Sequence, residues 1–162
     1  MTSFHELYES YARDVYRFAL YLSADHALAE DVTSETFIRV WSSLEPVRFA
    51  TVKAYLLTIA RNLCLMDRRR SSRLEGLEEA IPDSSPSMTR RAEVHDELDR
   101  VLRALQEFPE ADRAALLLRA EEGLSYEEIA AALDLPVATV KVKIHRARLK
   151  LAQIRSQGAI VR

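Results

Sequence analysis

The chain has 162 residues and a formal net charge of −2 at pH 7. Apolar residues make up 48% and charged residues 30%, which is typical of a globular protein rather than a disordered one. With only 3 Gly and 5 Pro, the chain lacks the turn residues of an all-β fold. Its abundant Ala, Leu, Glu and Arg are strong helix formers and predict an all-α protein.

Several kinds of site are not expected. The single cysteine, Cys64, excludes a disulfide within the chain, and its apolar neighbours predict a buried, unreactive thiol. The four histidines lie at no helical ligand spacing from one another or from Cys64, so no metal ion or other cofactor is expected. Neither a signal peptide nor an apolar run of roughly 18 residues is present, which predicts a cytoplasmic protein with no membrane contact of its own.

The first half predicts three helices. Apolar residues at a period of 3.6 predict helices over 4–22, about 27–43 and about 53–71. Pro46 interrupts the pattern within a short loop, 43–52.

The second of these helices has an apolar stripe and a polar flank. The residues expected to face the core are Phe37, Val40, Trp41 and Leu44. The residues expected off this stripe, and therefore exposed, are Asp31, Ser34, Glu35 and Ile38.

A segment rich in Ser and Pro separates the two halves. Residues 82–87 lack periodicity, which predicts a flexible linker over 73–92. The chain then divides into two small helical domains, 1–72 and 93–162. The helices predicted after the linker are about 93–107, 110–122, 126–133 and 137–154.

The small net charge conceals strong local charges. Residues 1–45 carry 3 basic and 8 acidic side chains, whereas residues 46–73 carry 7 basic and 1 acidic. Residues 93–135 carry 4 basic and 12 acidic side chains, whereas residues 136–162 carry 7 basic and none acidic. A phosphate backbone responds to the local field. Two basic segments therefore predict two nucleic-acid contacts; the alternative is that they are solvated helix faces.

The last two predicted helices have the pattern of a helix-turn-helix. Ser125 and Glu128 predict a capping box at the start of the short helix, and residues 134–136 connect it to a longer basic helix. At about 100° per residue, one line of the long helix is apolar and is expected to pack against Ile129 and Leu133. That line contains Val140, Ile144, Ala147 and Leu151. The opposite face and its borders form the candidate DNA surface: Ala138, Thr139, Lys141, Val142, Lys143, His145, Arg146, Arg148 and Lys150.

The chemistry of this face suits a major groove. Ala138 is small enough for close approach, Val142 offers methyl groups to a thymine methyl, and Arg146 can fork onto a guanine edge. The residues placed for phosphates are Lys141, Lys143, Arg148 and Lys150. No acidic residue follows Asp134, which favours DNA binding over a helical hairpin that merely imitates the motif.

Three motifs resemble those of one family, the extracytoplasmic-function (ECF) sigma factors of RNA polymerase. Residues 29–41, Ala-Glu-Asp-Val-Thr-Ser-Glu-Thr-Phe-Ile-Arg-Val-Trp, are similar to the family's region 2.2, and residues 54–63 are similar to its regions 2.3–2.4. Residues 125–130 followed by 139–148 resemble its region 4. The resemblance covers about residues 4–155. It implies a two-domain protein that gives core RNA polymerase its promoter specificity and is not an enzyme.

The resemblance also implies partners and site residues. Region 2.2 of the family docks on the clamp helices of the polymerase β′ subunit, which gives as candidates Asp31, Ser34, Glu35 and Ile38. The candidates for the melted −10 element are Arg48, Phe49, Arg61, Asn62, Arg68 and Arg69. Ordinary surface charge is the alternative for Asp31 and Glu35, and core packing is the alternative for Phe49. Region 4 is expected to read the −35 element as duplex while its acidic first half docks on the β flap, and an anti-sigma factor is implied by analogy alone.

Four positions depart from the family's pattern. Ser34 replaces a usual glutamine, and Asp134 replaces the usual glycine of the helix-turn-helix turn; Asp tolerates the left-handed conformation better than most residues. Val142 replaces a usual polar residue and Met66 a common aspartate. These last two bear on which promoter is read rather than on function.

Two other classes of function remain as alternatives. A one-component regulator of the LuxR kind also ends in a DNA-reading helix, but it needs a ligand or phosphoacceptor domain in place of residues 1–72. A helical adaptor without a DNA role would not need the two basic segments. An enzyme has the least support, because neither a nucleophile–base constellation nor a Gly-rich phosphate loop is present.

Overall fold

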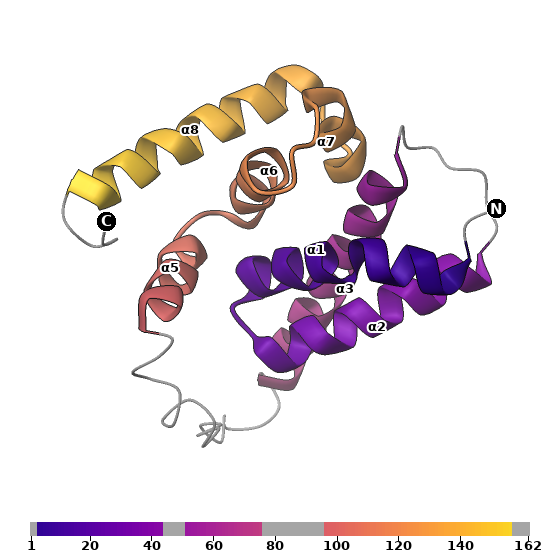
Figure 1. Cartoon of the computed structure of the whole chain (residues 1–162). Coiled ribbons are helices and arrows are strands. Elements are labelled where there is room, and N and C mark those ends of the chain that lie inside the picture. Colours follow the sequence, from indigo (N-terminus) through magenta and orange to yellow (C-terminus); the bar gives the residue numbers. More distant parts are fainter. Residues whose placement is uncertain (1–2, 44–50, 76–95, 157–162) are drawn as a thin grey trace.

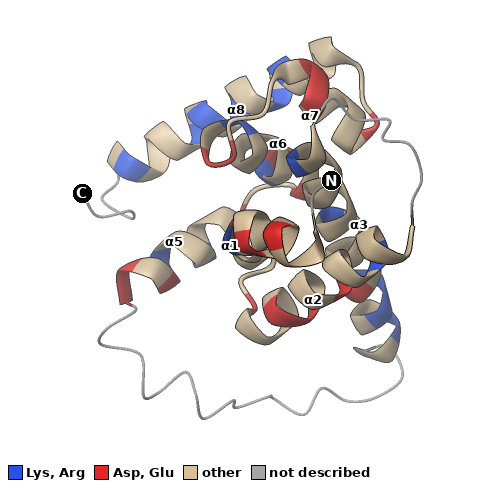
Figure 2. Cartoon of the chain, turned by 45° about the vertical axis from the view of Figure 1, so that its right-hand side comes forward, with Lys and Arg blue, Asp and Glu red and all other residues tan. Residues whose placement is uncertain are grey.

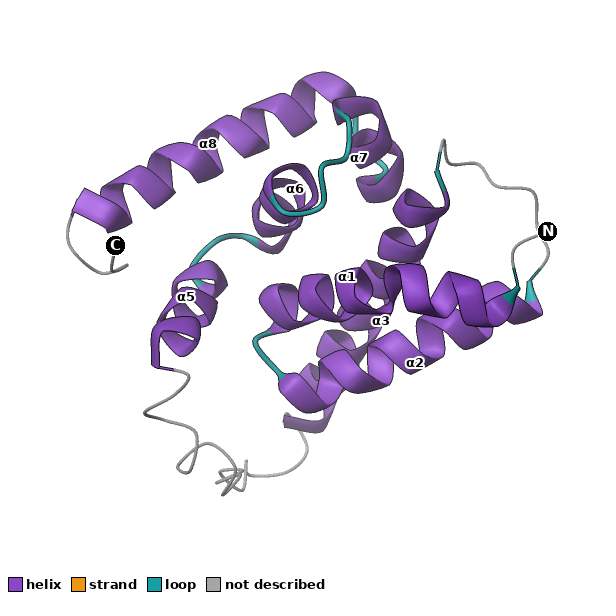
Figure 3. Ribbon diagram, in the orientation of Figure 1, coloured by secondary structure: helices purple, strands orange, loops and turns teal. Residues whose placement is uncertain are grey.

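The computed structural model describes residues 3–43, 51–75 and 96–156, and all regular structure in these ranges is α-helical (Figure 1 and Figure 3). The all-α prediction is confirmed. The observed helices are α1 (Phe4–Ser23), α2 (His26–Ser42), α3 (Val52–Glu75), α5 (Asp96–Gln106), α6 (Glu110–Ala120), α7 (Tyr126–Leu133) and α8 (Val137–Ser156). Their bounds follow the predicted ones closely, and the largest extension is at the end of α3.

The first three helices pack around one set of apolar side chains. Val15 and Phe18 of α1, Phe37 of α2 and Leu56 of α3 are each at most 1% exposed. Ser3 opens α1 in a capping box, which satisfies backbone donors that the first turn leaves free. These helices therefore form a packed unit that holds α2 and α3 side by side.

The predicted inward stripe of α2 is wrong at Trp41, which is 59% exposed and meets the Phe4 ring edge-on at 5.3 Å. The buried stripe instead includes two threonines, Thr33 and Thr36, beside Phe37. Each threonine hydroxyl donates to the backbone carbonyl four residues earlier, at 2.7 and 2.6 Å. This hydrogen bond satisfies the hydroxyl group inside the core. Threonines can therefore occupy buried positions, whereas a prediction from apolar residues alone places neighbouring residues there. Leu44, the fourth residue of the predicted stripe, lies outside the described residues.

Helix α6 is the centre of the second half. Its residues 112–118 are all buried. At its start, the Arg113 guanidinium donates from Nη1 to the carbonyl oxygens of Leu105 and Phe108, at 3.3 and 2.8 Å. Burial lowers the pKa of Arg113, because removal from water disfavours its charge. The two hydrogen bonds fix the corner where α5 turns into α6.

The connection between α7 and α8 has the predicted geometry. Ser125 and Glu128 form the expected capping box at the start of α7. Asp134 ends that helix at φ 55° and ψ 51°, in the left-handed region, and its N–H donates to the carbonyls of Ala130 and Ala131. An aspartate therefore performs the turn for which glycine is the less strained residue.

The two halves of the chain touch. Helix α6 lies against α1, and α7 lies against α3 (Figure 1). The contacts are described below because they involve candidate site residues. The division into domains 1–72 and 93–162 with a linker at 73–92 stays a prediction, since residues 76–95 lie outside the described part.

Burial, assisted by the nearby Glu110 and Asp67 carboxylates, raises the pKa of the Cys64 thiol to about 12. Because only the thiolate reacts, we expect alkylation of the native protein at pH 8 to be on the order of 10³-fold slower than alkylation of the unfolded chain. Iodoacetamide labelling with and without denaturant, followed by mass spectrometry, measures this ratio. Equal rates in the two states would show that the thiol is accessible.

Candidate nucleic-acid interface

Helix α8 has the two faces that its sequence predicts. Val140, Ile144 and Ala147 are each at most 1% exposed, and Ile129 and Leu133 of α7 are buried with them. On the other side, Val142 is 59% exposed, and Ala138, His145 and Arg146 are exposed as well. Figure 2 shows basic bands along α8 without any acidic residue. The helix thus combines a packed side with an open, basic side.

One flank of α8 runs along the corner between α5 and α6. Its three cations are all hydrogen-bonded there. Lys150 donates from Nζ to the backbone carbonyl of Glu107 at 2.6 Å, and this nitrogen lies 5.0 Å from the centre of the Phe108 ring. The Arg146 guanidinium donates from Nε and Nη2 to the two carboxylate oxygens of Asp112, at 2.7 and 3.0 Å. Lys143 adds a third bond to the same carboxylate, at 3.3 Å.

Asp112 is the residue of this site that sequence reasoning missed. Its side chain is 2% exposed, whereas that of Arg146 is 58% exposed, so the pair joins a buried anion to a surface cation. The hydrogen bonds from Arg146 hold the pKa of Asp112 below its usual value. Burial alone would raise this pKa, and the hydrogen bond from Lys143 lowers it as well. The signal in the sequence was an acidic residue within a helix that is otherwise apolar on that side, because a buried carboxylate needs a partner.

The remaining α8 candidates lie nearer the other flank or at the helix start. Lys141 lies over the Tyr126 ring with its Nζ 5.4 Å from the ring centre, and Arg119 lies over the same ring at 4.4 Å. Arg148 is exposed and Thr139 is half-buried. The exposed face is therefore bordered by cations on both sides.

The described candidates for the −10 element differ in how far they are exposed. Asn62, Arg68 and Arg69 of α3 are exposed. Arg61, in contrast, is only 13% exposed at its side chain, because its guanidinium forks onto the Glu110 carboxylate of α6, with Nε donating at 3.0 Å. Arg48 and Phe49 lie outside the described residues, so their predicted roles stay predictions.

Two family models match successive parts of the chain. The family model for sigma-70 region 2 matches residues 7–74, and the model for sigma-70 region 4 matches residues 98–151. The ECF RNA polymerase sigma factor SigL of Mycobacterium tuberculosis is 35% identical over 146 residues, which cover 87% of this chain and 82% of SigL. This chain belongs to the ECF family of RNA polymerase sigma factors. The ECF sigma factor SigE of Mycolicibacterium smegmatis is 42% identical over 158 residues, 93% of this chain but 61% of SigE, so the chain spans less than two thirds of that relative.

Solved structures share the fold of this ECF protein. The sigma factor RpoE in its complex with the anti-sigma factor NepR from Bartonella quintana superposes with a TM-score of 0.77 at 24% identity, over 96% of this chain and 98% of RpoE. CnrH in complex with the cytosolic domain of CnrY gives a TM-score of 0.71 at 25% identity, over 95% of this chain and 88% of that one. The likeness extends over both halves of the chain.

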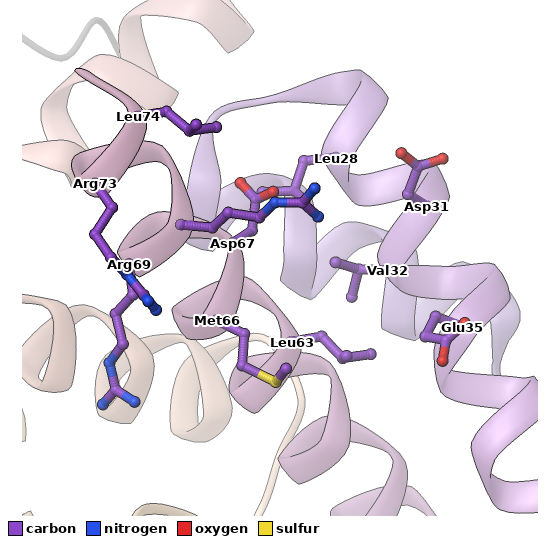
Figure 4. Close-up of a pocket in the computed structure, with 11 residues that line it drawn as sticks. Leu28, Asp31, Val32, Glu35, Leu63, Met66, Asp67, Arg69, Arg73 and Leu74 are labelled. Carbon is purple, nitrogen blue, oxygen red and sulfur yellow. The ribbon is translucent and has the colours of Figure 1, made fainter. Parts of the chain in front are cut away.

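The α2 flank that resembles sigma region 2.2 borders a groove of about 680 Å³ between α2 and the end of α3 (Figure 4). Asp31, Ser34 and Ile38 are exposed, as predicted, whereas Glu35 is half-buried and accepts a hydrogen bond from Arg39 at 3.0 Å. Apolar and charged side chains both line the groove. Its residues are Leu28, Asp31, Val32, Glu35, Leu63, Met66, Asp67, Arg69, Arg70, Arg73 and Leu74.

Ion pairs join the two halves of this sigma factor. The Glu122 side chain, which is fully buried just after α6, accepts from Nε and Nη2 of Arg17 at 3.2 and 2.9 Å, and Lys53 lies 3.4 Å away. The Glu122 hydrogen bond raises the pKa of Arg17. Together with the Arg61–Glu110 pair, these contacts place acids of the second half on cations of the first.

Within the described ranges, no helix is both long and apolar enough to cross a bilayer. The same residues contain no cluster of three or more His, Cys, Asp or Glu side chains that could hold a metal ion.

Ile144 and Arg146 are two residues apart but differ in burial, and this predicts different effects on folding. Ile144→Ala leaves a cavity and should lower the free energy of unfolding by roughly 2–5 kcal/mol. Sequence alone predicts that Arg146→Ala leaves stability almost intact. The structure predicts a moderate loss, smaller than that of Ile144→Ala, because the buried Asp112 keeps only Lys143. Urea titrations of both variants measure the difference, and equal losses would contradict it.

The lowered pKa of Asp112 predicts how its contribution to stability depends on pH. A depressed pKa stabilises the folded state above the ordinary aspartate pKa of about 3.9, and this contribution is lost as the pH falls through the folded-state value. Wild type should therefore exceed Asp112→Asn in stability at pH 7, and the gap should close below about pH 4. Denaturant midpoints of the two proteins across this range test the prediction; a gap that does not narrow between pH 4 and pH 2 would contradict it.

Proposed function

We propose that this chain binds core RNA polymerase and directs promoter-specific initiation of transcription as an ECF sigma factor, with no catalytic activity of its own and no cofactor. The observation that carries the proposal is the ordered match to sigma-70 region 2 and region 4, over residues 7–74 and 98–151. The curated relatives that the chain matches are named as ECF RNA polymerase sigma factors. The first half matches region 2, where the LuxR-like alternative needs a ligand or phosphoacceptor domain.

The two DNA contacts are assigned to two helices. In this assignment α8 enters the major groove of the −35 element with Val142 near the centre of its open face, and its bordering cations meet phosphates. The exposed residues Asn62, Arg68 and Arg69 of α3 hold the melted −10 strand together with Arg48 and Phe49 of the preceding loop. Unpaired bases need stacking surfaces and hydrogen-bonding side chains, which these residues supply. Support comes from the exposure of Val142, Arg146 and Arg148 on α8 and of Asn62, Arg68 and Arg69 on α3.

Protein partners are assigned to other surfaces. The α2 flank with Asp31, Ser34, Glu35 and Ile38 is assigned to the β′ clamp helices, and the acidic first half of 93–162 to the β flap. An anti-sigma factor is a further expected partner, and CnrH, which shares this fold, was solved with the cytosolic domain of CnrY. Function with core polymerase places the protein in the cytoplasm.

The Arg61–Glu110 pair gives a reason for dependence on polymerase. Glu110 accepts from Nε and Nη2 of Arg61, and the Arg61 side chain is only 13% exposed between the two halves, so a DNA phosphate cannot reach it there. The two halves must separate before Arg61 reaches DNA, and binding to polymerase surfaces far apart would separate them. The isolated chain is therefore expected to bind promoter DNA weakly.

Transcription in vitro tests the function. Core polymerase with a genomic promoter library is transcribed with and without the chain, and the 5′ ends are sequenced. A sigma factor yields new 5′ ends that share two upstream boxes. Absence of new ends, or tight specific DNA binding by the free chain at physiological salt, would reject the proposal and favour a regulator.

Reversing the charge of Asp31 tests the polymerase surface. Asp31→Arg should weaken binding to core polymerase, because an exposed acid of the docking flank becomes basic, while the melting temperature stays nearly unchanged. Glu9→Arg, which makes the same reversal at an exposed position of α1, is the matched control and should bind normally. Core affinity is measured by fluorescence titration. Normal affinity of Asp31→Arg, or equal losses in both variants, would remove Asp31 from the interface.

A further inference from the structure

The contact between Asp112 and Arg146 uses only one edge of the guanidinium. Arginine has five N–H donors in a planar fork. Asp112 accepts from Nε and from one N–H of Nη2, at 2.7 and 3.0 Å. The outer edge, formed by Nη1 and the second N–H of Nη2, is left out of this contact. Those two donors are the pair that a guanine needs for a bidentate contact through O6 and N7.

The position of Arg146 directs that outer edge away from the domain. Asp112 lies behind it on α6 and is 2% exposed, whereas the Arg146 side chain is 58% exposed. Arg146 lies one turn after Val142 on α8, and Val142 is 59% exposed on the open face. A buried carboxylate that holds the inner edge of the guanidinium already restricts the arginine side chain. Less conformational entropy is therefore lost when the guanidinium contacts a base.

The local charge permits DNA to approach. An acidic residue near a phosphate backbone is normally unfavourable. Here the carboxylate is buried and is shared by Arg146 and Lys143, so these three groups together keep one positive charge. The arrangement orients an arginine without making the surface negative.

We propose that Asp112 is a positioning residue for −35 recognition, which holds the Arg146 guanidinium with its two outer donors toward a guanine in the major groove. The inference rests on the proposed function and deepens it. The specificity for that base pair then belongs to the Asp112–Arg146 pair rather than to Arg146 alone. The opposite role, in which Asp112 competes with DNA for Arg146, predicts the opposite sign in the test.

Base substitution across the −35 element tests the proposal in the holoenzyme. Promoters found with the wild-type holoenzyme are altered one base pair at a time and transcribed by wild type, Asp112→Asn, Arg146→Ala and the double variant. Arg146→Ala identifies the base pair that Arg146 reads. Asp112→Asn should reduce the preference for that base pair by about 2- to 12-fold, the cost of immobilising one long side chain, and leave preferences elsewhere unchanged. In the Arg146→Ala background, the same change should have no further effect on the preference.

Two further variants remove simpler explanations. Glu127→Gln removes one negative charge from an exposed position of α7 and should not change the base preference. Asp112→Leu fills the buried position without a carboxylate and replaces Asp112→Asn in the experiment if that variant folds poorly. It should show the same reduced preference for the base pair that Arg146 reads. Circular dichroism and melting temperatures establish that each variant is folded.

Nuclear magnetic resonance provides a readout that does not depend on transcription. The Arg146 Nε–H of the full chain should exchange slowly with solvent in wild type and rapidly in Asp112→Asn. Rapid exchange in wild type, an equal loss at every −35 sequence, or unchanged or sharper discrimination in Asp112→Asn would each overturn the proposal. If the wild-type holoenzyme yields no promoter-directed 5′ ends, the proposed function fails, and this inference fails with it, whatever the exchange rate of Arg146.

Discussion

A carboxylate is stable inside a helical bundle only when a cation accompanies it, and the structure is organised around three such carboxylates on or beside α6. Glu110 is paired with Arg61 of α3, Asp112 with Arg146 and Lys143 of α8, and Glu122 with Arg17 of α1. Residues 112–118 of α6 are buried at the centre of the second half. From this helix, the pair of Glu110 reaches α3 and the pairs of Asp112 reach α8, and these two helices carry the candidate DNA surfaces. The placement of α1, α3 and α8 around α6 depends on satisfying these charges.

Local sequence rules predict much of this arrangement. The faces of α8, the capping box at Ser125 and the left-handed Asp134 depend on contacts between residues close in sequence, and each was predicted from periodicity or turn chemistry. The error at Trp41 arose from a local effect, the hydrogen bonds of two buried threonines to their own helix.

The ion pairs were beyond sequence reasoning for a different reason. Arg61 and Glu110 are 49 residues apart, and Arg17 and Glu122 are 105 residues apart, so no periodicity connects them. The alternation of acidic and basic segments was interpreted as a sign of two nucleic-acid contacts, and it could not pair individual residues. Asp112 shows the same limit, since its acidic side chain was visible in the sequence while its partners on α8 were not.

Basic residues of α3 and α8 have carboxylate partners before any DNA is present. In both arginines the carboxylate accepts from Nε and Nη2, but the Arg61 side chain is 13% exposed and the Arg146 side chain is 58% exposed, so only Arg146 offers its outer edge to solvent. The same pairing that packs the helices therefore also sets which cations DNA can reach.

The carboxylate shared by Lys143 and Arg146 also affects how many cations DNA would release on binding to α8. Binding to duplex DNA releases about 0.9 condensed cations for each phosphate that the protein neutralises, so the dependence of affinity on salt counts effective charges rather than residues. Lys143 and Arg146 share Asp112 and together supply one such charge instead of two. In the proposed assignment of α8 to the −35 element, counterion release is therefore expected to be smaller than the number of lysines and arginines on α8 implies, and binding less sensitive to ionic strength.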